Sequence, residues 1–493
     1  MHTDRFTPLD AATLLRWMQH DLPNKQLFGI DRELFFMPKP DDPFRMERYG
    51  KVLETPLGVA AGPHTQLAQN ILSAWLCGAR YIELKTVQVL DELNVAKPCI
   101  DMADEGYNCE WSQELKLDQS FEEYLKAFVL LYVLRDMLNL PVEAEPGKGP
   151  GFIFNMSAGY NLEGIKSPAV QRFLDRMENA EEDVKRIKAG LAPLYPAIEK
   201  MPIPARLSDN LTVSTMHGCP PDEVESIGRY FITERKYNTA IKLNPTLLGP
   251  ERLRDILNTQ LGYDVCVPDE AFGHDLKYND GVAIIRNLAA AAETAGVAFG
   301  LKLTNTLETA NEKQNLPRSE GMVYMSGRSL HPISINLAER LQQEFDGKLD
   351  IAFSAGVDTF NVADTLACGL RPITMSSDIL KPGGYGRLHQ YLDTLRAEMR
   401  KAGAHTIAEW EKSRSPIAGN PGFANLVSYA AAVLGKHSRY HKERFPYVSV
   451  KTERPLPRFD CAAAPCMSGC PAEQDIPRYL DAVARGDFEL AWR

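Results

Sequence analysis

The chain has 493 residues, of which 44% are hydrophobic and 24% are charged, a balance that is typical of globular proteins and excludes wholesale disorder. Its net charge of −10 argues against a nucleic-acid-binding or basic membrane-surface protein, and no stretch approaches the roughly 18 continuous apolar residues of a membrane span. The start, MHTDRFTPLD, has neither the basic nor the apolar region of a signal peptide. We therefore expect a cytoplasmic, enzyme-sized protein whose nine cysteines form no disulfide framework.

The first 50 residues are predicted to be an extension that precedes the main domain. They hold a short amphipathic helix, from Ala11 to His20, and then a run rich in proline and aspartate, MPKPDDPF. After residue 50, short apolar strands alternate with longer helical patterns, which is typical of a parallel sheet built from βα units. Eight such units favour a closed (β/α)8 barrel, or TIM barrel, over an open doubly wound sheet. The predicted strands are Leu57–Ala61, Tyr81–Thr86, Phe152–Met156, Leu211–Ser214, Ala240–Leu243, Phe299–Thr304, Ile351–Ser354 and Pro372–Met375.

Helical patterns between these strands cover residues 119–138, 167–191, 280–296 and 335–347. A further helical run, over residues 426–445, either closes the barrel or leaves it. The two prolines in VKTERPLPRFD predict an extended linker after it. A last helix is predicted to start within DIPRYLDAVARGDFELAWR, where the chain stops.

The carboxyl ends of the predicted strands carry polar and glycine-rich segments, and in TIM barrels this end of the strands holds the functional site. Lys85, Lys242 and Lys302 each interrupt an apolar strand near its end. Burial of a lysine shifts its pKa or demands an anionic partner, so we interpret these lysines as ligand or cofactor contacts rather than stray surface charges. Some of the Ser, Asn and Asp residues at these ends could instead be helix N-caps.

Two further segments bear on the ligand. FSAGVD and MSSDILKPGGYG follow strands seven and eight, where these barrels commonly bind phosphate through small residues and backbone N–H groups. A phosphorylated cofactor or substrate is therefore expected. The G-x-G of PGKGPGF precedes a strand instead of following one, so it does not predict a nicotinamide site.

The cysteines fall into two groups. Cys77, Cys99, Cys109, Cys219, Cys266 and Cys368 are scattered singly, and such cysteines are mostly small buried hydrophobes. Cys461, Cys466 and Cys470 lie within ten residues, directly before Pro471. Three thiolates this close predict ligands of one soft metal or of iron–sulfur clusters.

These motifs resemble the FMN-binding barrels of dihydropyrimidine dehydrogenases and dihydroorotate dehydrogenases. TPLGVAAGP, ELKTVQ, IKLNPT, LKLTNT, MSGRSLHPI and FSAGVD follow the order of the corresponding family motifs over roughly residues 50 to 400. The tail, CAAAPCMSGCPAEQDIPRYL, is similar to the iron–sulfur domain of dihydropyrimidine dehydrogenase and of the glutamate synthase small subunit. The order of the two parts, together with STMHGCPPDEVESI, resembles the N-terminal part of the YgfK-type family of proposed selenate reductase subunits, iron–sulfur flavoproteins associated with bacterial purine catabolism.

The resemblance implies roles for individual residues. The implied FMN contacts are Ala60, Ala61, Gly62, Lys85, Thr86, Lys242, Gly327, Ser354, Ala355, Gly356, Ser376 and Ser377. The implied substrate contacts are Asn161, Asn305 and Thr306, and Cys219 matches the cysteine that exchanges a proton with substrate, with His217 as the neighbouring alternative acid. The implied ligands of a 4Fe–4S cluster are Cys461, Cys466 and Cys470.

The chain departs from the related families at two of these motifs. Met216-His217-Gly218 stands where the pyrimidine enzymes have N-x-S before the cysteine, and Arg458 stands where the cluster pattern has a further cysteine. Three cysteines cannot complete a four-ligand cluster. The expected organisation is therefore an extension (1–50), an FMN-binding TIM barrel (51–440), a linker (441–460) and the start of a helical iron–sulfur domain that is cut at residue 493 (461–493).

The implied function is that of an FMN-dependent oxidoreductase. It would pass electrons from NAD(P)H, through FAD and iron–sulfur clusters in a missing C-terminal part, to a purine- or pyrimidine-like heterocycle. An electron relay to or from a partner molybdenum enzyme, with no small substrate of its own, is the alternative. A third reading is a lyase or aldolase that uses Lys242 or Lys302 as a Schiff base.

Overall fold

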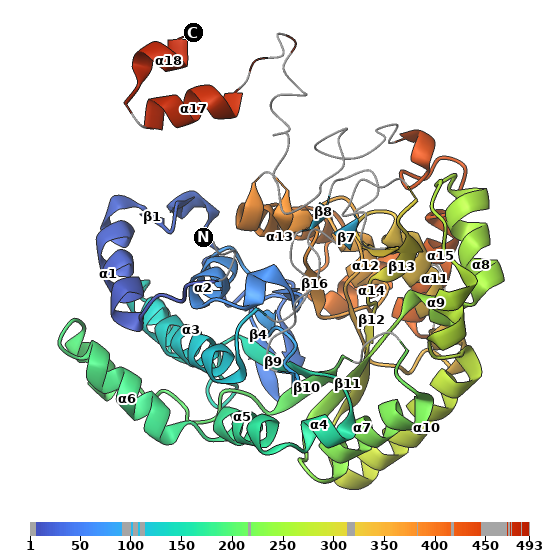
Figure 1. Ribbon diagram of the computed structural model, residues 1–493, viewed down its shortest axis with the longest axis horizontal. Coiled ribbons are helices and arrows are strands. Elements are labelled where there is room, and N and C mark those ends of the chain that lie inside the picture. Colours follow the sequence, from blue (N-terminus) through green and yellow to red (C-terminus); the bar gives the residue numbers. More distant parts are fainter. Residues whose placement is uncertain are drawn as a thin grey trace.

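The computed structural model describes residues 6–90, 100–101, 107–108, 114–214, 218–312, 321–381, 383–415, 419–444, 471, 474, 476–484 and 486–492. Eight parallel strands close a barrel in the order β10-β11-β12-β15-β16-β5-β6-β9 (Figure 1). Each predicted strand corresponds to one of these eight, and the predicted α/β barrel fold is confirmed. The barrel strands are β5 (Leu57–Val59), β6 (Tyr81–Glu83), β9 (Ile153–Ala158), β10 (Asn210–Val213), β11 (Asn238–Leu243), β12 (Phe299–Leu303), β15 (Ile351–Phe353) and β16 (Ile373–Met375).

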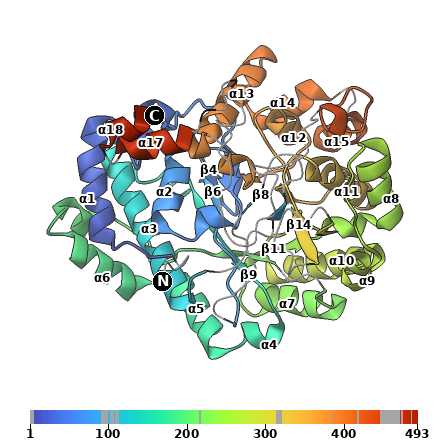
Figure 2. The ribbon, with the colours of Figure 1, turned by 45° about the horizontal axis from the view of Figure 1, so that its top comes forward.

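Helices cover the outside of the barrel (Figures 1 and 2). The helical pattern over residues 167–191 divides into two helices, because Asn179 adopts an extended backbone conformation that ends the first of them. The second begins with three acidic residues in its first turn, where negative charge is favourable. The helices around the barrel are α2 (Ala68–Leu76), α3 (Leu117–Met137), α4 (Leu162–Ile165), α5 (Pro168–Glu178), α6 (Glu181–Leu191), α7 (Pro221–Thr233), α8 (Pro250–Arg254), α9 (Asp269–His274), α10 (Tyr278–Ala295), α11 (Leu330–Glu344), α12 (Val362–Ala367), α13 (Arg387–Lys401), α14 (Ile407–Arg414) and α15 (Pro421–Ala432).

The first 50 residues pack against the barrel. Helix α1 (Ala11–Asp21) begins at Asp10, whose side chain accepts a hydrogen bond from the Thr13 N–H at 2.8 Å, and it contacts α3 and α6. A short pair, β1 (Gln26–Leu27) and β2 (Ile30–Asp31), follows. A hairpin of β3 (Met46–Arg48) and β4 (Lys51–Leu53) carries the buried Arg48, which donates to Asp350 beside β15 at 3.0 Å.

A second sheet lies beyond the carboxyl ends of the barrel strands and is absent from the sequence prediction. Its order is β13-β14-β7-β8. Two of its strands are only two residues long, too short to show a periodic pattern. The strands are β7 (Ile100–Asp101), β8 (Tyr107–Asn108), β13 (Leu307–Ala310) and β14 (Met322–Met325).

Residues after the barrel return to it. Helix α15 contacts α11, α12 and α14, so the predicted helical run that begins near residue 426 stays with the barrel. Helices α17 (Ile476–Ala484) and α18 (Phe488–Trp492) lie in the segment for which a last helix is predicted, and they pack on one another. Among the helices that the structure describes, none is long and apolar enough to span a bilayer.

Candidate functional site

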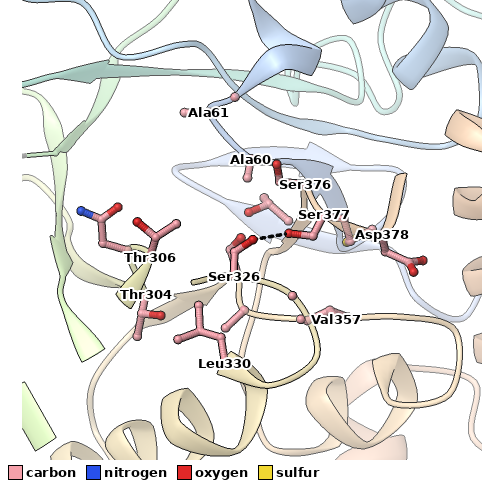
Figure 3. A pocket seen from close by; sticks show the side chains of 18 of the residues that line it. Ala60, Ala61, Thr304, Thr306, Ser326, Leu330, Val357, Ser376, Ser377 and Asp378 are labelled. Atoms are coloured by element: carbon pink, nitrogen blue, oxygen red, sulfur yellow. Dashed lines mark hydrogen bonds between the residues drawn. The ribbon is translucent and has the colours of Figure 1, made fainter. Parts of the chain in front are cut away.

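A cavity opens at the carboxyl ends of the barrel strands, where the sequence predicts the site (Figure 3). Its empty volume is about 820 Å³, a figure that includes the open mouth. The lining residues come from loops after several barrel strands and from the second sheet. They are Ala60, Ala61, Gly62, Lys85, Ile100, Lys242, Thr304, Asn305, Thr306, Ser326, Gly327, Leu330, Ser354, Ala355, Gly356, Val357, Thr374, Met375, Ser376, Ser377 and Asp378.

One end of the cavity presents several hydrogen-bond donors. In the described part of the chain, nothing accepts a hydrogen bond from the backbone N–H groups of Ala355, Gly356 and Val357. Main-chain N–H groups at a glycine turn are a common phosphate-binding arrangement. The hydroxyls of Ser326 and Ser377 lie 2.9 Å apart at the same end (Figure 3). This end can therefore hold a phosphate.

Asp378 also lines this end, but basic side chains balance its charge. Arg387 donates to its two carboxylate oxygens at 2.8 and 3.0 Å, and Lys381 lies 3.0 Å away. Burial opposes ionisation of Asp378, yet the hydrogen bonds from Arg387 and the charge of Lys381 lower its pKa below the usual value. The carboxylate thus fixes the loop after β16 without adding uncompensated negative charge.

Two lysines belong to the lining of the cavity. Lys85 and Lys242 both line it, and both are largely buried. Burial lowers the pKa of Lys242 to about 8; the charge of Glu83 works against this shift, and the charges of Lys302 and Lys85 add to it. A ligand that carries negative charge would stabilise the protonated lysines.

Lys302 has a different position from the other two predicted lysines. Its ammonium group donates to Glu83 and to the Thr374 hydroxyl inside the barrel, and it does not line the cavity. The interpretation of Lys302 as a ligand contact is therefore wrong: its charge is satisfied by a buried carboxylate from the facing strand.

The three predicted substrate residues do not all line the cavity. Asn305 and Thr306 line the cavity. Asn161 does not: its side chain caps helix α4 and accepts the Gly164 N–H at 2.8 Å. Thr86, a predicted FMN contact, also lies off the cavity, and its hydroxyl forms a 2.8 Å hydrogen bond with Ser157.

The predicted proton donors lie in the loop after β10. His217 is outside the described residues. Cys219 is half-buried two residues before α7 begins and does not line the cavity. The preceding Gly218 N–H donates to the buried Asp275 at 3.3 Å, and Asp275 also accepts from Thr246 at 2.6 Å. A buried carboxylate thus anchors the base of this loop, and the role of Cys219 stays a prediction.

The predicted cluster ligands, Cys461, Cys466 and Cys470, also lie outside the described residues. Within the part of the chain that the structure describes, no group of three or more His, Cys, Asp or Glu side chains could hold a metal ion. The cluster assignment therefore stays a prediction.

Several lining residues were missed from the sequence. Ser326 precedes the glycine of MSGRSLHPI, and Asp378 follows the serine pair of TMSSD, so both stand within one residue of a predicted contact. Ile100 belongs to the two-residue strand β7 and offered no such signal. The other missed residues are Thr304, Leu330, Val357, Thr374 and Met375.

Comparison with known proteins connects the barrel to one family. The family model described as "Oxidoreductase YgfK, N-terminal TIM-barrel domain" matches residues 28–418. The chain is 41% identical over 477 residues to the oxidoreductase YgfK of Escherichia coli strain K12, and equally similar to that of strain O157:H7. The match covers 92% of this chain and 44% of each relative, so the chain spans less than half the length of these relatives.

Solved structures with a similar architecture include two of DHODH from Eimeria tenella. The ligand-free form has a TM-score of 0.43 at 16% identity, covering 76% of this chain and 92% of that one. The complex with ferulenol has a TM-score of 0.45 at 15% identity, covering 83% of this chain and 96% of that one. The barrel assignment itself follows from the strand pairing and from the family match.

Proposed function

This chain belongs to the YgfK oxidoreductase family through its N-terminal TIM-barrel domain, and we propose that its barrel binds FMN and acts as the redox module of a larger flavoprotein. One observation carries the proposal. Of the twelve residues for which the sequence resemblance implies an FMN contact, eleven line the same cavity, and Thr86 is the exception. Those residues come from six separate segments of the chain. A false resemblance would not be expected to bring residues from six segments into one cavity.

The chemistry of the lining fits this cofactor. The N–H groups of Ala355, Gly356 and Val357 would bind the phosphate, with the Ser377 hydroxyl beside them. Lys85 and Lys242 would place positive charge near the cofactor, where it favours negative charge on the ligand. When bound, FMN would supply the transfer of a hydride or of single electrons.

We propose that a purine- or pyrimidine-like heterocycle binds in the same cavity. Asn305 and Thr306, which line the cavity, have the amide and hydroxyl groups that orient such a ring. Reduction of a C=C or C=N bond requires a proton as well as a hydride, and Cys219 or His217 would supply that proton.

The wider assignments rest on the sequence resemblance. They comprise NAD(P)H as electron donor, FAD and iron–sulfur clusters as carriers and, in the relay alternative, a molybdenum enzyme as partner. The cytoplasmic location is a separate prediction. The lyase reading is the weaker one, because the matching family and relatives are described as oxidoreductases. Of its two candidate lysines, Lys302 is paired with Glu83, and Lys242 alone lines the cavity.

Cofactor uptake tests the proposal directly. The purified chain is incubated with FMN and desalted, and its visible spectrum is recorded. We expect about one flavin per chain to be retained, as for a cofactor held in a preformed pocket. Lys242→Met should weaken retention, whereas Lys185→Met, at an exposed lysine in α6, should not. A chain that remains colourless after exposure to saturating FMN would contradict the proposal.

A ligand titration separates the enzyme from the relay. Purines and pyrimidines are added to the FMN-loaded chain while the flavin spectrum is monitored. An enzyme should show a saturable spectral change with at least one heterocycle, and Asn305→Ala should weaken it. If no heterocycle changes the spectrum and Asn305→Ala leaves electron transfer to a redox partner unaffected, the relay is the better assignment.

A further inference from the structure

The loop that would hold the phosphate, residues 355–357, is held in place by hydrogen bonds to two of its backbone carbonyl groups. The Ala355 carbonyl oxygen lies 2.7 Å from His331 Nδ1. The next carbonyl oxygen, that of Gly356, accepts from the Asn361 side-chain amide at 3.0 Å. His331 is fully buried in α11, and Asn361 is buried at the start of α12. Two side chains from different helices therefore hold two consecutive carbonyls on the side away from the cavity.

The protonation of His331 follows from its partners. A carbonyl oxygen can only accept, so Nδ1 must carry the proton. Burial lowers the pKa of His331 to about 3, so the imidazole is neutral and its Nε2 can only accept. That nitrogen lies 2.9 Å from the hydroxyl of Tyr429, which must therefore donate to it.

The remaining hydrogen bonds close a circuit. Because the Tyr429 hydroxyl donates its proton to His331, the Tyr429 oxygen accepts a hydrogen bond from the Tyr440 hydroxyl, 3.4 Å away. The Tyr440 oxygen in turn accepts a hydrogen bond from the side-chain amide of Asn361 at 2.8 Å. The side-chain oxygen of Asn361 accepts a hydrogen bond from the Asp358 N–H at 2.9 Å. We call the four side chains the backing network. They are His331, Asn361, Tyr429 and Tyr440.

These hydrogen bonds also determine the direction of the N–H groups on the opposite side of the loop. A peptide unit whose carbonyl is fixed on one side directs the next N–H group to the other side, because the unit is planar and trans. The N–H groups of Gly356 and Val357 follow the two fastened carbonyls, and in the described part of the chain nothing accepts from them. Val357 and Leu330, the first residue of α11, both line the cavity (Figure 3).

We infer that the backing network is a set of positioning residues that gives the cavity its preference for a phosphorylated ligand. The inference rests on the FMN site proposed above and adds to it which side chains hold the phosphate loop in its binding conformation. None of the four lines the cavity, so they would act through the carbonyl groups of Ala355 and Gly356.

Two members of the network lie beyond the part of the chain that the family model matches. That match ends at residue 418, whereas Tyr429 belongs to α15 and Tyr440 follows it. The ring of Tyr440 also stacks on His331, with centroids 5.1 Å apart and planes within 16°. The segment after the barrel therefore has a function at the site besides covering α11.

A comparison of FMN with riboflavin tests the inference, because the two ligands differ by the phosphate alone. Dissociation constants are measured by flavin fluorescence for the full chain and for His331→Phe and Tyr429→Phe. In each variant we expect the affinity for FMN to fall about tenfold, the effect of roughly one hydrogen bond, and the affinity for riboflavin to change less than about twofold. Tyr132→Phe, a buried tyrosine of α3, is the matched control and should keep the wild-type ratio.

The outcomes are distinct. Loss of the preference for FMN over riboflavin in both variants supports the inference. Variants that keep the wild-type preference, or that lose affinity for both ligands equally, overturn it, as does a wild-type chain that binds the two equally. A wild-type chain that binds neither ligand overturns the proposed FMN site itself. Should His331→Phe fail to fold, as judged by circular dichroism, Tyr429→Phe alone decides.

Discussion

Gly356 lies where two segments of the cavity wall approach closely. Its φ of +54° lies in the left-handed region, which costs other residues roughly 1 kcal/mol or more. A Cβ atom at this position would lie 2.2 Å from the Gly327 carbonyl oxygen, well inside contact distance. Glycine is therefore required here for two reasons, and both concern the loop that would hold the phosphate.

Gly356→Ala should abolish FMN retention, because the loop must move away from Gly327 to admit the methyl group. The matched control is Gly403→Ala: its φ of +68° carries a similar strain, but nothing lies within 4 Å of the added carbon. We expect both variants to lose about 1 kcal/mol of stability from strain, and only Gly356→Ala to lose the cofactor. Equal FMN retention by the two variants would show that the close approach to Gly327 does not matter for binding.

At the scale of residues, many of the side chains expected at the site line the cavity because they lie at the end of a barrel strand or soon after it, while their roles stay predictions. Strand ends converge on one rim, so a residue such as Lys242 or Ser376 is placed by the fold itself. Lys302 is different, because it is satisfied by Glu83 from a strand 219 residues away. Asn161 is also different, since the same residue type serves as ligand contact and as helix cap. No property of the local sequence distinguishes these cases.

At the scale of elements, a buried ion-pair cluster joins α3 to the base of the barrel. Glu54, directly after β4, accepts from Arg80 at 2.6 Å and from Arg135 in α3 at 2.9 Å. Arg80 also stacks on Trp75 of α2, with its guanidinium carbon 4.3 Å from the ring centroid. All three charged side chains are almost completely shielded from water.

Glu54→Gln should destabilise the protein by about 3–5 kcal/mol, because it leaves two buried guanidinium groups without a counter-charge. The measurement is urea unfolding monitored by circular dichroism. Glu225→Gln removes the partner of Arg229 in an exposed pair on α7 and should cost no more than about 1 kcal/mol. A similar cost for both variants would mean that the buried cluster contributes little to holding α3 in place.

Regular elements of the barrel could be predicted because apolar strands and amphipathic helices have periods that the sequence displays. The second sheet could not, because β7 and β8 have two residues each, and β7 also pairs with β14, a strand far away in the chain, where Ile100 lies opposite Tyr324. Since Ile100 also lines the cavity, the part of the fold that escaped prediction is a part that shapes the site.

For the whole molecule, the titratable groups that make stability depend on pH include two histidines. Both are buried and neutral, and both lie at the functional end of the barrel. Burial, with a contribution from the nearby charge of Lys85, lowers the pKa of His64 to about 4. Burial, with a contribution from Arg439, lowers the pKa of His331 to about 3. Both values lie below the roughly 6.5 expected in the unfolded chain, so the unfolded state binds protons more readily than the folded state.

The folded chain should therefore lose stability as the pH falls below about 6.5 and be independent of these two groups above it. Each histidine contributes a loss of about 1.4 kcal/mol per pH unit until the pH approaches its folded pKa. The thermal midpoint of the chain without added flavin, measured between pH 7 and pH 4.5, should fall more steeply for wild type than for a His64→Gln, His331→Gln double variant. His405→Gln, at an exposed histidine, should follow the wild-type curve. Parallel curves for wild type and the double variant would show that neither histidine is held neutral by the fold.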